Sequence, residues 1–332
     1  MFKELLLKIK ENFLYFVPPP EFLRMSHVGL NVSDHSIKIL ELKRGRGGYK
    51  LSYFNDEPIA EGIIKSGNIN DRDALREAFQ RIKKKYNLSF VGVTLPEEKA
   101  YVFRLKVPKT TNDKEIRSNI EFQLEDNVPL SINEALFDYE VIPQDSDRQH
   151  MYVSVHVLPQ KVVASYVSLL KDVGITPLYF EIEADSIARS VIKRNDPSTF
   201  MLVDYGRTRT GFSVVGRGVV RYTSTAEIGG DSITKIIMDQ FKVSAKEAEK
   251  IKNEKGLFRD EENPELYMSL ANAVSVLRDE INKRFIFWHT HKVEGKEDPI
   301  KEIILVGGNS NIFGLEEYLS SSLKVKVERA NI

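Results

Sequence analysis

The chain has 332 residues, of which 42% are hydrophobic and 29% are charged, and its 48 lysine and arginine residues balance 48 aspartate and glutamate residues. This composition is typical of a globular protein with more than one core, and a net charge of zero provides no field that would attract nucleic acid. The absence of cysteine excludes disulfides and thiol chemistry, and no apolar run approaches the roughly 20 residues needed to span a bilayer.

The first 25 residues predict an amphipathic helix and a proline-rich linker. Apolar residues recur at helical spacing, and three prolines then end the helix; these residues are Phe2, Leu5, Leu6, Ile9, Phe13, Phe16 and Pro18, Pro19, Pro20. Charged residues interrupt the apolar stretch, so it does not read as a signal peptide. A membrane surface, a groove of a partner and the rest of the same protein remain three alternative docking sites for this helix.

The segments after Met25 and after Arg194 show the same order of elements. HVGLNV, SIKILELKR and YKLSYFNDEPI predict three strands, followed by a helix that begins at Asn70 or Asp71 and a buried strand, LSFVGVTL. TFMLVDYG, TGFSVVGRG and VVRYTSTAEIGG predict three further strands before the helix DSITKIIMDQFKV. The chain therefore contains one α/β unit twice.

The first turn of each unit carries matching residues. In GLNVSDHSIKILEL and LVDYGRTRTGFSVV, strand one ends in a polar residue, a small residue follows two places on, and hydroxyl side chains open strand two; these are Asn31, Ser33, Ser36 and Asp204, Gly206, Thr208, Thr210. Backbone N–H groups of such turns can cradle a phosphate, and a carboxylate at the strand end can hold hydrated magnesium. The alternative is a pair of ordinary hairpins whose residues satisfy backbone geometry alone.

A third motif follows the last buried strand. IILVGGNSNIFGL ends a strand in Gly307 and Gly308, and a helix begins near Gly314. Paired glycines let a flat ligand lie against bare backbone, and the positive end of a helix dipole favours phosphate. Three motifs in this order indicate a nucleotide site more strongly than any one of them.

These motifs resemble those of the actin-like ATPases from about Val28 to the end of the chain. VGLNVSDHSIKILEL resembles the first phosphate loop, FEIEADSIARSV the first connecting helix, LVDYGRTRTGFSVV the second phosphate loop and IILVGGNSNIFGL the adenosine loop. EIGGDSITKIIMDQFKVSAKEAEKIK resembles the segment that bridges the last two loops. The resemblance implies an α/β, actin-like (ribonuclease H-like) duplicated two-domain ATPase fold.

The middle of the chain resembles the PilM family of type IV pilus assembly, relatives of FtsA. EFQLEDNVPLSINEALFDYEVI is the most diagnostic stretch and implies a small α+β subdomain inserted in domain one. The expected division is an N-terminal helix and linker in 1–25, domain one in 26–96 and 176–197, the insert in 97–175, and domain two in 198–332. The polar helix face of the insert, with Lys114, Arg117, Glu121 and Glu125, suggests a docking surface.

The resemblance also implies that ATP and Mg²⁺ bind between the two domains. Glu183 and Asp204 are the implied catalytic residues, and Asp204 is also the implied metal ligand. The implied nucleotide contacts are Asn31, Ser33, Asp34, His35, Ser36, Lys38, Gly206, Arg207, Thr208, Gly229, Gly230, Glu249, Lys252, Gly307, Gly308 and Asn309. For Lys38 and Glu183 the alternative is an ordinary solvated charge on a strand and on a helix.

Two departures from the family pattern bear on activity. Asn31 stands where the family usually has aspartate, and Ser33 stands where it usually has glycine. Because an amide carries no negative charge, metal binding must depend on Asp204, and we expect slow or no ATP hydrolysis. Arg207 and Arg209 could offset phosphate charge, and alternation along the strand should point only one of them at the ligand.

The function implied is a cytoplasmic, ATP-binding adaptor of type IV pilus assembly, held peripherally at the inner face of the cytoplasmic membrane. It would dock the short N-terminal cytoplasmic tail of a PilN-like inner-membrane protein in a groove near the insert. Other pilus assembly components and a second copy of the chain are further expected partners, and nucleic acid is not. The alternatives are a nucleotide-free, GspL-like secretion scaffold, an FtsA-like division anchor, and a sugar or acid kinase.

Overall fold

The computed structural model describes residues 27–45, 48–109, 112–143, 149–257, 264–290 and 298–331. The predicted N-terminal helix lies outside these residues. Within them, no helix combines the length and the apolar character needed to cross a membrane. The chain divides into two compact units, one made of Met1–Lys65, Ile69–Thr94 and Tyr166–Phe180, and the other of Ser66–Asn68, Leu95–Ser165 and Glu181–Ile332.

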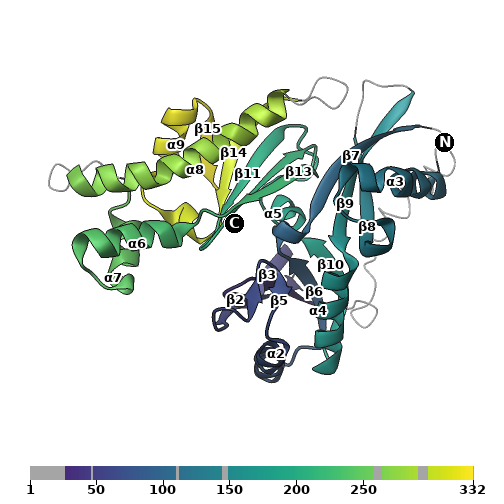
Figure 1. The fold of residues 1–332 in the computed structure, drawn as a ribbon, viewed down its shortest axis with the longest axis horizontal. Helices are drawn as coiled ribbons and strands as arrows, with labels where there is room; N and C mark the ends of the chain where they lie inside the picture. The colour runs from purple at the N-terminus through teal and green to yellow at the C-terminus, as the bar shows by residue number, and fades with distance from the viewer. Residues whose placement is uncertain are drawn as a thin grey trace. The chain divides into compact units, whose positions relative to one another are not determined.

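The first unit is built on a five-stranded sheet of order β10-β6-β1-β2-β3 (Figure 1). Its strands are β1 (Val28–Val32), β2 (Ser36–Gly45), β3 (Gly48–Pro58), β6 (Phe90–Leu95) and β10 (Thr176–Ile182). β1, β2 and β3 form an antiparallel meander, and β6 runs parallel to β1. The predicted order of three strands, a helix and a strand is confirmed. The sequence analysis missed two short strands, β4 (Ile64–Lys65) and β5 (Asn68–Ile69).

Two helices contribute to the core of this unit. α2 (Arg72–Tyr86) buries the predicted Leu75, Phe79 and Ile82, and α4 (Gln160–Asp172) buries Tyr166, Leu169 and Leu170. Asp71 is the N-cap residue of α2. Its carboxylate accepts a hydrogen bond of 2.9 Å from the N–H of Ala74 in the first turn of the helix. Arg72 joins the two helices through Asp172, at 2.8 Å.

A small antiparallel sheet of order β7-β9-β8 forms the predicted α+β insert. Its strands are β7 (Tyr101–Pro108), β8 (Ala135–Ile142) and β9 (His150–Pro159), and η3 (Ile132–Glu134) precedes β8. α3 (Asp113–Asn127) covers one face, where Ile116, Ile120 and Leu124 pack with valines of β9. Asn112 and Glu115 form a capping box at the start of α3, which satisfies backbone N–H groups that the helix itself leaves open.

The sheet of the second unit has the order β13-β12-β11-β14-β15. Its strands are β11 (Thr199–Tyr205), β12 (Thr210–Gly216), β13 (Val219–Ala226), β14 (Ile300–Val306) and β15 (Lys326–Arg329). The helices are α5 (Glu183–Val191), α6 (Gly230–Phe241), α7 (Ala245–Glu254), α8 (Pro264–Thr290) and α9 (Leu315–Leu323). α5 packs with Phe200 and Leu202 on one face, whereas Met201 and Val203 pack with α6, α8 and α9 on the other (Figure 1). Both faces of β11 are therefore buried, which accounts for its almost continuous apolar sequence.

The two large sheets repeat one topology. In each, a three-stranded antiparallel meander lies beside a parallel strand, in the orders β3-β2-β1-β6 and β13-β12-β11-β14. The predicted duplicated α/β fold with a small α+β insert is confirmed. The predicted residue boundaries of the domains stay a prediction.

Candidate functional site

The turn between β11 and β12 folds back tightly after Asp204. The N–H of Gly206 donates hydrogen bonds of 3.0 Å to the carbonyls of Asp204 and Arg209. A Cβ at Gly206 would lie 2.9 Å from the Arg209 carbonyl oxygen, closer than side chains tolerate. The small residue that the sequence analysis singled out is therefore required by the turn itself.

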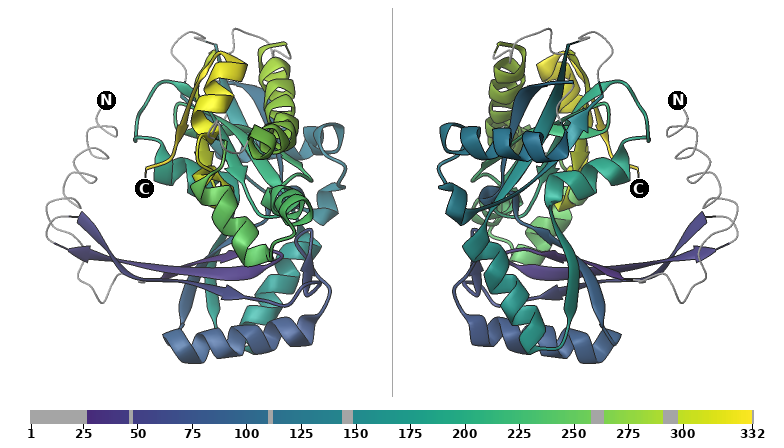
Figure 2. Two further views of the ribbon diagram at one scale, coloured as in Figure 1. Left: turned by 90° about the vertical axis from the view of Figure 1, so that its left-hand side faces the viewer. Right: turned by 90° about the vertical axis from the view of Figure 1, so that its right-hand side faces the viewer.

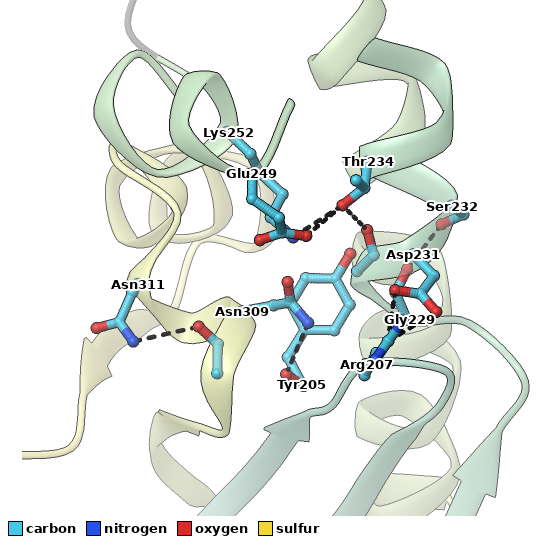
Figure 3. A network of polar contacts seen from close by, with 12 residues as sticks. Tyr205, Arg207, Gly229, Asp231, Ser232, Thr234, Glu249, Lys252, Asn309 and Asn311 are labelled. Carbon is cyan, nitrogen blue, oxygen red and sulfur yellow. Dashed lines mark hydrogen bonds and ion pairs between the residues drawn. The ribbon is translucent and has the colours of Figure 1, made fainter. Parts of the chain in front are cut away.

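The loop after β14 lies directly against this turn. Asn309 is buried, and its Nδ2 donates hydrogen bonds of 2.7 Å to the Gly206 carbonyl and 3.3 Å to the Tyr205 carbonyl (Figure 3). Gly307 has a φ of +83°, and a Cβ there would meet Asp204 Oδ1 at 2.3 Å. At Gly308, by contrast, no atom lies within 4 Å of where a Cβ would be. The two loops are thus fixed to each other, and Gly308 leaves open space beside them.

The start of α6 completes this cluster through two further close approaches. The N–H groups of Gly230 and Asp231 donate to the carbonyls of Gly206 and Arg207, at 3.1 and 2.9 Å. A Cβ on Gly229 would lie 2.3 Å from the Arg207 carbonyl oxygen, and a Cβ on Gly230 would lie 1.9 Å from Asn309 Oδ1. Both glycines therefore let α6 pack against the two loops. We call the segments Asp204–Thr210, Gly229–Thr234 and Gly307–Asn309 the three-loop cluster.

A charged network joins α6 to α7 above the cluster (Figure 3). Lys252 is buried, and its Nζ lies 2.6 Å from Glu249 Oε1 and 3.0 Å from Thr234 Oγ1. Thr234 Oγ1 is also 3.0 Å from the Gly230 carbonyl. Burial raises the pKa of Glu249, but hydrogen bonds from Lys252 and Thr234 outweigh burial, so the net shift is downward. The ionised Glu249 thereby compensates the buried cation of Lys252.

The two arginines of the turn have different partners. Arg207 is largely exposed, and its Nε lies 3.0 Å from Asp231 Oδ1. Arg209 is more buried and forms an ion pair with Glu98. Glu98 lies in η2 (Glu97–Lys99), the short helix after β6.

Glu97, which was not predicted as a site residue, is buried near the predicted catalytic residues. Its Oε1 has no hydrogen-bond partner, and a Cβ on Gly211 would lie 2.7 Å from its Oε2. Burial raises its pKa well above the usual value of 4.5, and the nearby carboxylates of Glu183 and Asp204 raise it further. Burial and the neighbouring carboxylates thus favour the neutral acid form of Glu97. The signal available in the sequence was the position of LPEEK, which puts two acids directly after a buried strand, as LVDYG does with Asp204.

In the first unit, the turn between β1 and β2 bonds to itself. The N–H of Ser33 donates to the Ser36 carbonyl at 3.0 Å, and the Ser36 N–H donates to Ser33 Oγ at 3.2 Å. Asn31 Nδ2 donates to Thr94 Oγ1 at 2.9 Å, and Lys38 is the cross-strand neighbour of Asn31. Asp34 and His35 lie within this turn, and the His35 carbonyl accepts a bond of 3.0 Å from the N–H of Ile59.

The predicted site residues thus fall into two groups, one in each unit. Among the residues that the structure describes, no cluster of three or more His, Asp or Glu side chains could hold a metal ion by itself. Asp204 and Glu183 each lie near Glu97, since each raises the pKa of its carboxyl group. One carboxylate with phosphate oxygens is a donor set that suits Mg²⁺, whereas a site made only of protein ligands is not present in these segments.

The repeated sheet topology, with loops crowded at the ends of β11 and β14, defines an actin-like ATPase fold. A structure titled PilM-PilN type IV pilus biogenesis complex has a TM-score of 0.73 and 19% identity, with 93% of this chain and 89% of that chain covered. MreB5 of Spiroplasma citri bound to ADP has a TM-score of 0.55 and 14% identity, with 92% and 91% covered. Ethanolamine utilization protein EutJ from Carboxydothermus hydrogenoformans has a TM-score of 0.54 and 14% identity, with 94% and 85% covered.

The family model of the type IV pilus assembly protein PilM matches residues 29–332. The chain belongs to this family. The resemblance to actin-like ATPases and to the PilM family inferred from the sequence is confirmed.

The buried acid predicts a specific pH dependence of stability. Above pH 4.5 Glu97 ionises in the unfolded chain but stays protonated in the folded protein, so the unfolded state binds fewer protons. The free energy of unfolding should then fall as pH rises, by at most about 1.4 kcal/mol per pH unit, until pH reaches the raised pKa of the folded state. Glu97→Gln removes this titration. We expect the difference in melting temperature between Glu97→Gln and the parent to change in favour of the variant from pH 5 to pH 8, because only the parent loses stability. A difference that stays constant would contradict a raised pKa at Glu97.

The adjacent glycines of the β14 loop predict opposite outcomes. Gly307→Ala should lower the free energy of unfolding by about 2 kcal/mol or more, because the new methyl group meets Asp204 at a positive φ. Gly308→Ala is the matched control and should change it by less than about 0.5 kcal/mol, because its methyl group enters open space. Urea unfolding of both variants measures the difference, and equal losses would contradict the geometry described.

Proposed function

We propose that the protein is an ATP-binding adaptor of type IV pilus assembly that binds the cytoplasmic tail of a PilN-like membrane protein. The observation that carries this proposal is the three-loop cluster, which holds an open glycine and a carboxylate together in a chain of the PilM family. We place the protein in the cytoplasm, held at the inner face of the membrane by its partner. The structure titled as a PilM-PilN complex supports this choice of partner.

The proposed nucleotide site depends on the backbone and the side chains of the three-loop cluster that a ligand could contact. Gly308 offers bare backbone against which a base or sugar can lie. Asp204 ends β11 and would hold Mg²⁺ together with phosphate oxygens, while Arg207 lies at the surface of the same turn. The MreB5 structure with ADP has the same fold and supports a nucleotide ligand. The residues of the β1–β2 turn stay predictions for the same ligand.

We further propose that hydrolysis is slow or absent. Asn31 cannot supply negative charge, and its amide is already bonded to Thr94. Glu97 lies near Asp204, but its raised pKa favours the neutral acid, which is a poor acceptor for a proton from an attacking water. The bound nucleotide would then act as a structural ligand rather than as a substrate.

The partner part of the proposal rests on the insert. Phe122 of α3 is 86% exposed, which is unusual for a large aromatic side chain. The same helix carries several charged side chains, of which Glu125 lies one turn from Phe122; these are Lys114, Arg117, Glu121 and Glu125. An apolar anchor within a polar rim is the usual composition of a surface that binds a short peptide.

Nucleotide binding predicts a ligand-dependent melting temperature. ATP with Mg²⁺ should raise the melting temperature of the parent, because a ligand that binds only the folded state stabilises it. Gly308→Ala and Asp204→Ala should each reduce this rise, the first by blocking the open backbone and the second by removing the carboxylate. Equal melting temperatures of the parent with and without ATP would reject the nucleotide proposal and favour a nucleotide-free scaffold.

Partner binding predicts a measurable affinity for a synthetic tail peptide. Isothermal titration of the parent with the N-terminal peptide of a PilN-like protein should show binding, and a scrambled peptide should not bind. Phe122→Ser should weaken binding about tenfold, equivalent to about 1.4 kcal/mol. Met268→Ser, which changes another exposed apolar side chain on α8, is the matched control. Failure of the parent to bind the peptide, with ATP or without it, would reject the adaptor proposal.

A further inference from the structure

The insert sheet has a second face, which packs on α5 and β13. β7 and β9 lie beside β13 (Figures 1 and 2), and α3 covers the opposite face of the insert sheet. Ile142 and Tyr152 pack with Val219 of β13. Because side chains alternate along a strand, Ser154 and His156 of β9 share this face with Tyr152.

His156 joins the insert to both of these elements. Its side chain is 13% exposed, and its Nδ1 lies 3.0 Å from Asp185 Oδ2 of α5. Its Nε2 lies 3.3 Å from Ser154 Oγ and 3.4 Å from the carbonyl oxygen of Val220 in β13. Ser154 Oγ in turn donates a hydrogen bond of 2.5 Å to the same carbonyl. One imidazole ring thus contacts α5 through one nitrogen and β13 through the other.

A serine, a histidine and an aspartate in this order resemble the catalytic triad of hydrolases, in which the serine attacks a substrate. Ser154 cannot take that role, because it is fully buried and its hydroxyl proton is donated to the Val220 carbonyl. A nucleophile must instead be open to its substrate and give its proton to the histidine. The three side chains therefore connect elements of the fold and do not form a hydrolase site.

The hydrogen-bonding groups around the ring favour its doubly protonated form. The Asp185 carboxylate and the Val220 carbonyl are acceptors, and Ser154 presents only lone pairs to the ring while its proton goes to Val220. A neutral imidazole has one N–H group, so one of its nitrogens would face an oxygen with no proton between them. Turning the Ser154 hydroxyl toward the ring would remove a donor from the Val220 carbonyl. The imidazolium, by contrast, has an N–H group for each side.

The charges near the ring favour the same form. Burial lowers the pKa of His156, but the hydrogen bond with Asp185 and the charges of Asp185 and Glu140 outweigh burial, so the net shift is upward from 6.5. Glu140 lies on β8, as does the cross-strand neighbour of His156. The charged side chains on the surrounding β7, β8, α5, β13 and η2 are Arg104, Asp138, Glu140, Glu183, Asp185, Arg189, Arg221 and Glu97.

We propose that His156 is a pH-dependent latch, whose imidazolium form holds the insert sheet against α5 and β13. When the ring loses a proton, it keeps a donor for only one of these two elements. The apolar contacts of Ile142 and Tyr152 remain, but the insert moves more freely relative to α5. Because α5 begins at Glu183, the latch joins the insert to the helix that carries a predicted catalytic residue.

The protonation of His156 can be measured in the full chain. Nuclear magnetic resonance of protein with labelled histidines should give a titration midpoint above 6.5 for this ring, and His156→Gln identifies its signal. Asp185→Asn should lower the midpoint, because it removes the charge that favours the imidazolium. His289→Gln is the matched control and should leave the midpoint unchanged, since Nδ1 of His289 bonds the Phe285 carbonyl and not a carboxylate. A midpoint of His156 at or below 6.5 would overturn the proposal.

The movement of the insert is measured by the distance between two spin labels. The chain contains no cysteine, so Glu121→Cys on α3 and Val276→Cys on α8 place the labels at two exposed positions alone. Double electron–electron resonance should give a narrow distance distribution one pH unit below the midpoint of His156 and a broader one at one unit above it. With His156→Gln added, the distribution should be the same at both pH values, because glutamine does not titrate.

The stability of the fold gives an independent measure of the latch. A histidine whose pKa is raised in the folded state stabilises the protein fully below its unfolded pKa of 6.5, and this contribution is lost as pH rises through the folded pKa. The melting temperature of the parent relative to His156→Gln should therefore fall over that range. Equal label distributions in the parent at both pH values, or a broadening that persists in His156→Gln, would overturn the proposal.

Discussion

The close contact between three backbone segments is the constraint on which the second unit depends. Asn309 donates its amide to two carbonyls of the β11–β12 turn, and its side chain fills the space that a Cβ on Gly230 would need. Buried carbonyls without a partner are costly, so this side chain, together with the N–H of Gly230, satisfies carbonyls that the turn cannot satisfy itself. The glycines around it are required because neighbouring atoms leave no space for a larger residue. The positions of Asp204 and Gly308 follow from this packing.

The same packing explains the unusual state of Glu97. η2 brings Glu97 against Gly211, and the absence of a side chain on Gly211 allows the carboxyl group to approach β12. Three further carboxylates, Glu183, Asp204 and Asp185, lie near it, and ionising Glu97 would require a charge to be buried beside them. The neighbouring Glu98 forms an ion pair with Arg209. Adjacent glutamates of one short helix thus have different surroundings, because Glu98 lies beside a cation whereas Glu97 lies beside other carboxylates.

The features that could be predicted from the sequence are those set by local pattern. Alternating apolar residues defined the meander strands, the spacing of Leu75, Phe79 and Ile82 defined α2, and the order of motifs defined the duplicated fold. Two-residue strands such as β4 and β5 have no periodicity to detect. The burial of Glu97 depends on elements more than 80 residues apart in the sequence, and no local pattern reports it. β3 has one extra residue, Ser52, where its pairing with β2 shifts, and this bulge could not be predicted either, because it depends on the register between the two strands.

Because Asn309 acts as a hydrogen-bond donor, the three-loop cluster is sensitive to deamidation of this residue. Asparagine is among the residues that heat and time convert, by loss of ammonia, to the corresponding acid. At this position an aspartate would present a carboxylate oxygen, rather than an N–H group, to the carbonyls of Tyr205 and Gly206. The Gly206 carbonyl would keep its hydrogen bond from the N–H of Gly230, but both carbonyls would lose the donor that joins them to the β14 loop and would face a carboxylate instead. Loss of one amide nitrogen, with almost no change in shape, would be enough to separate the loops that this side chain now holds together.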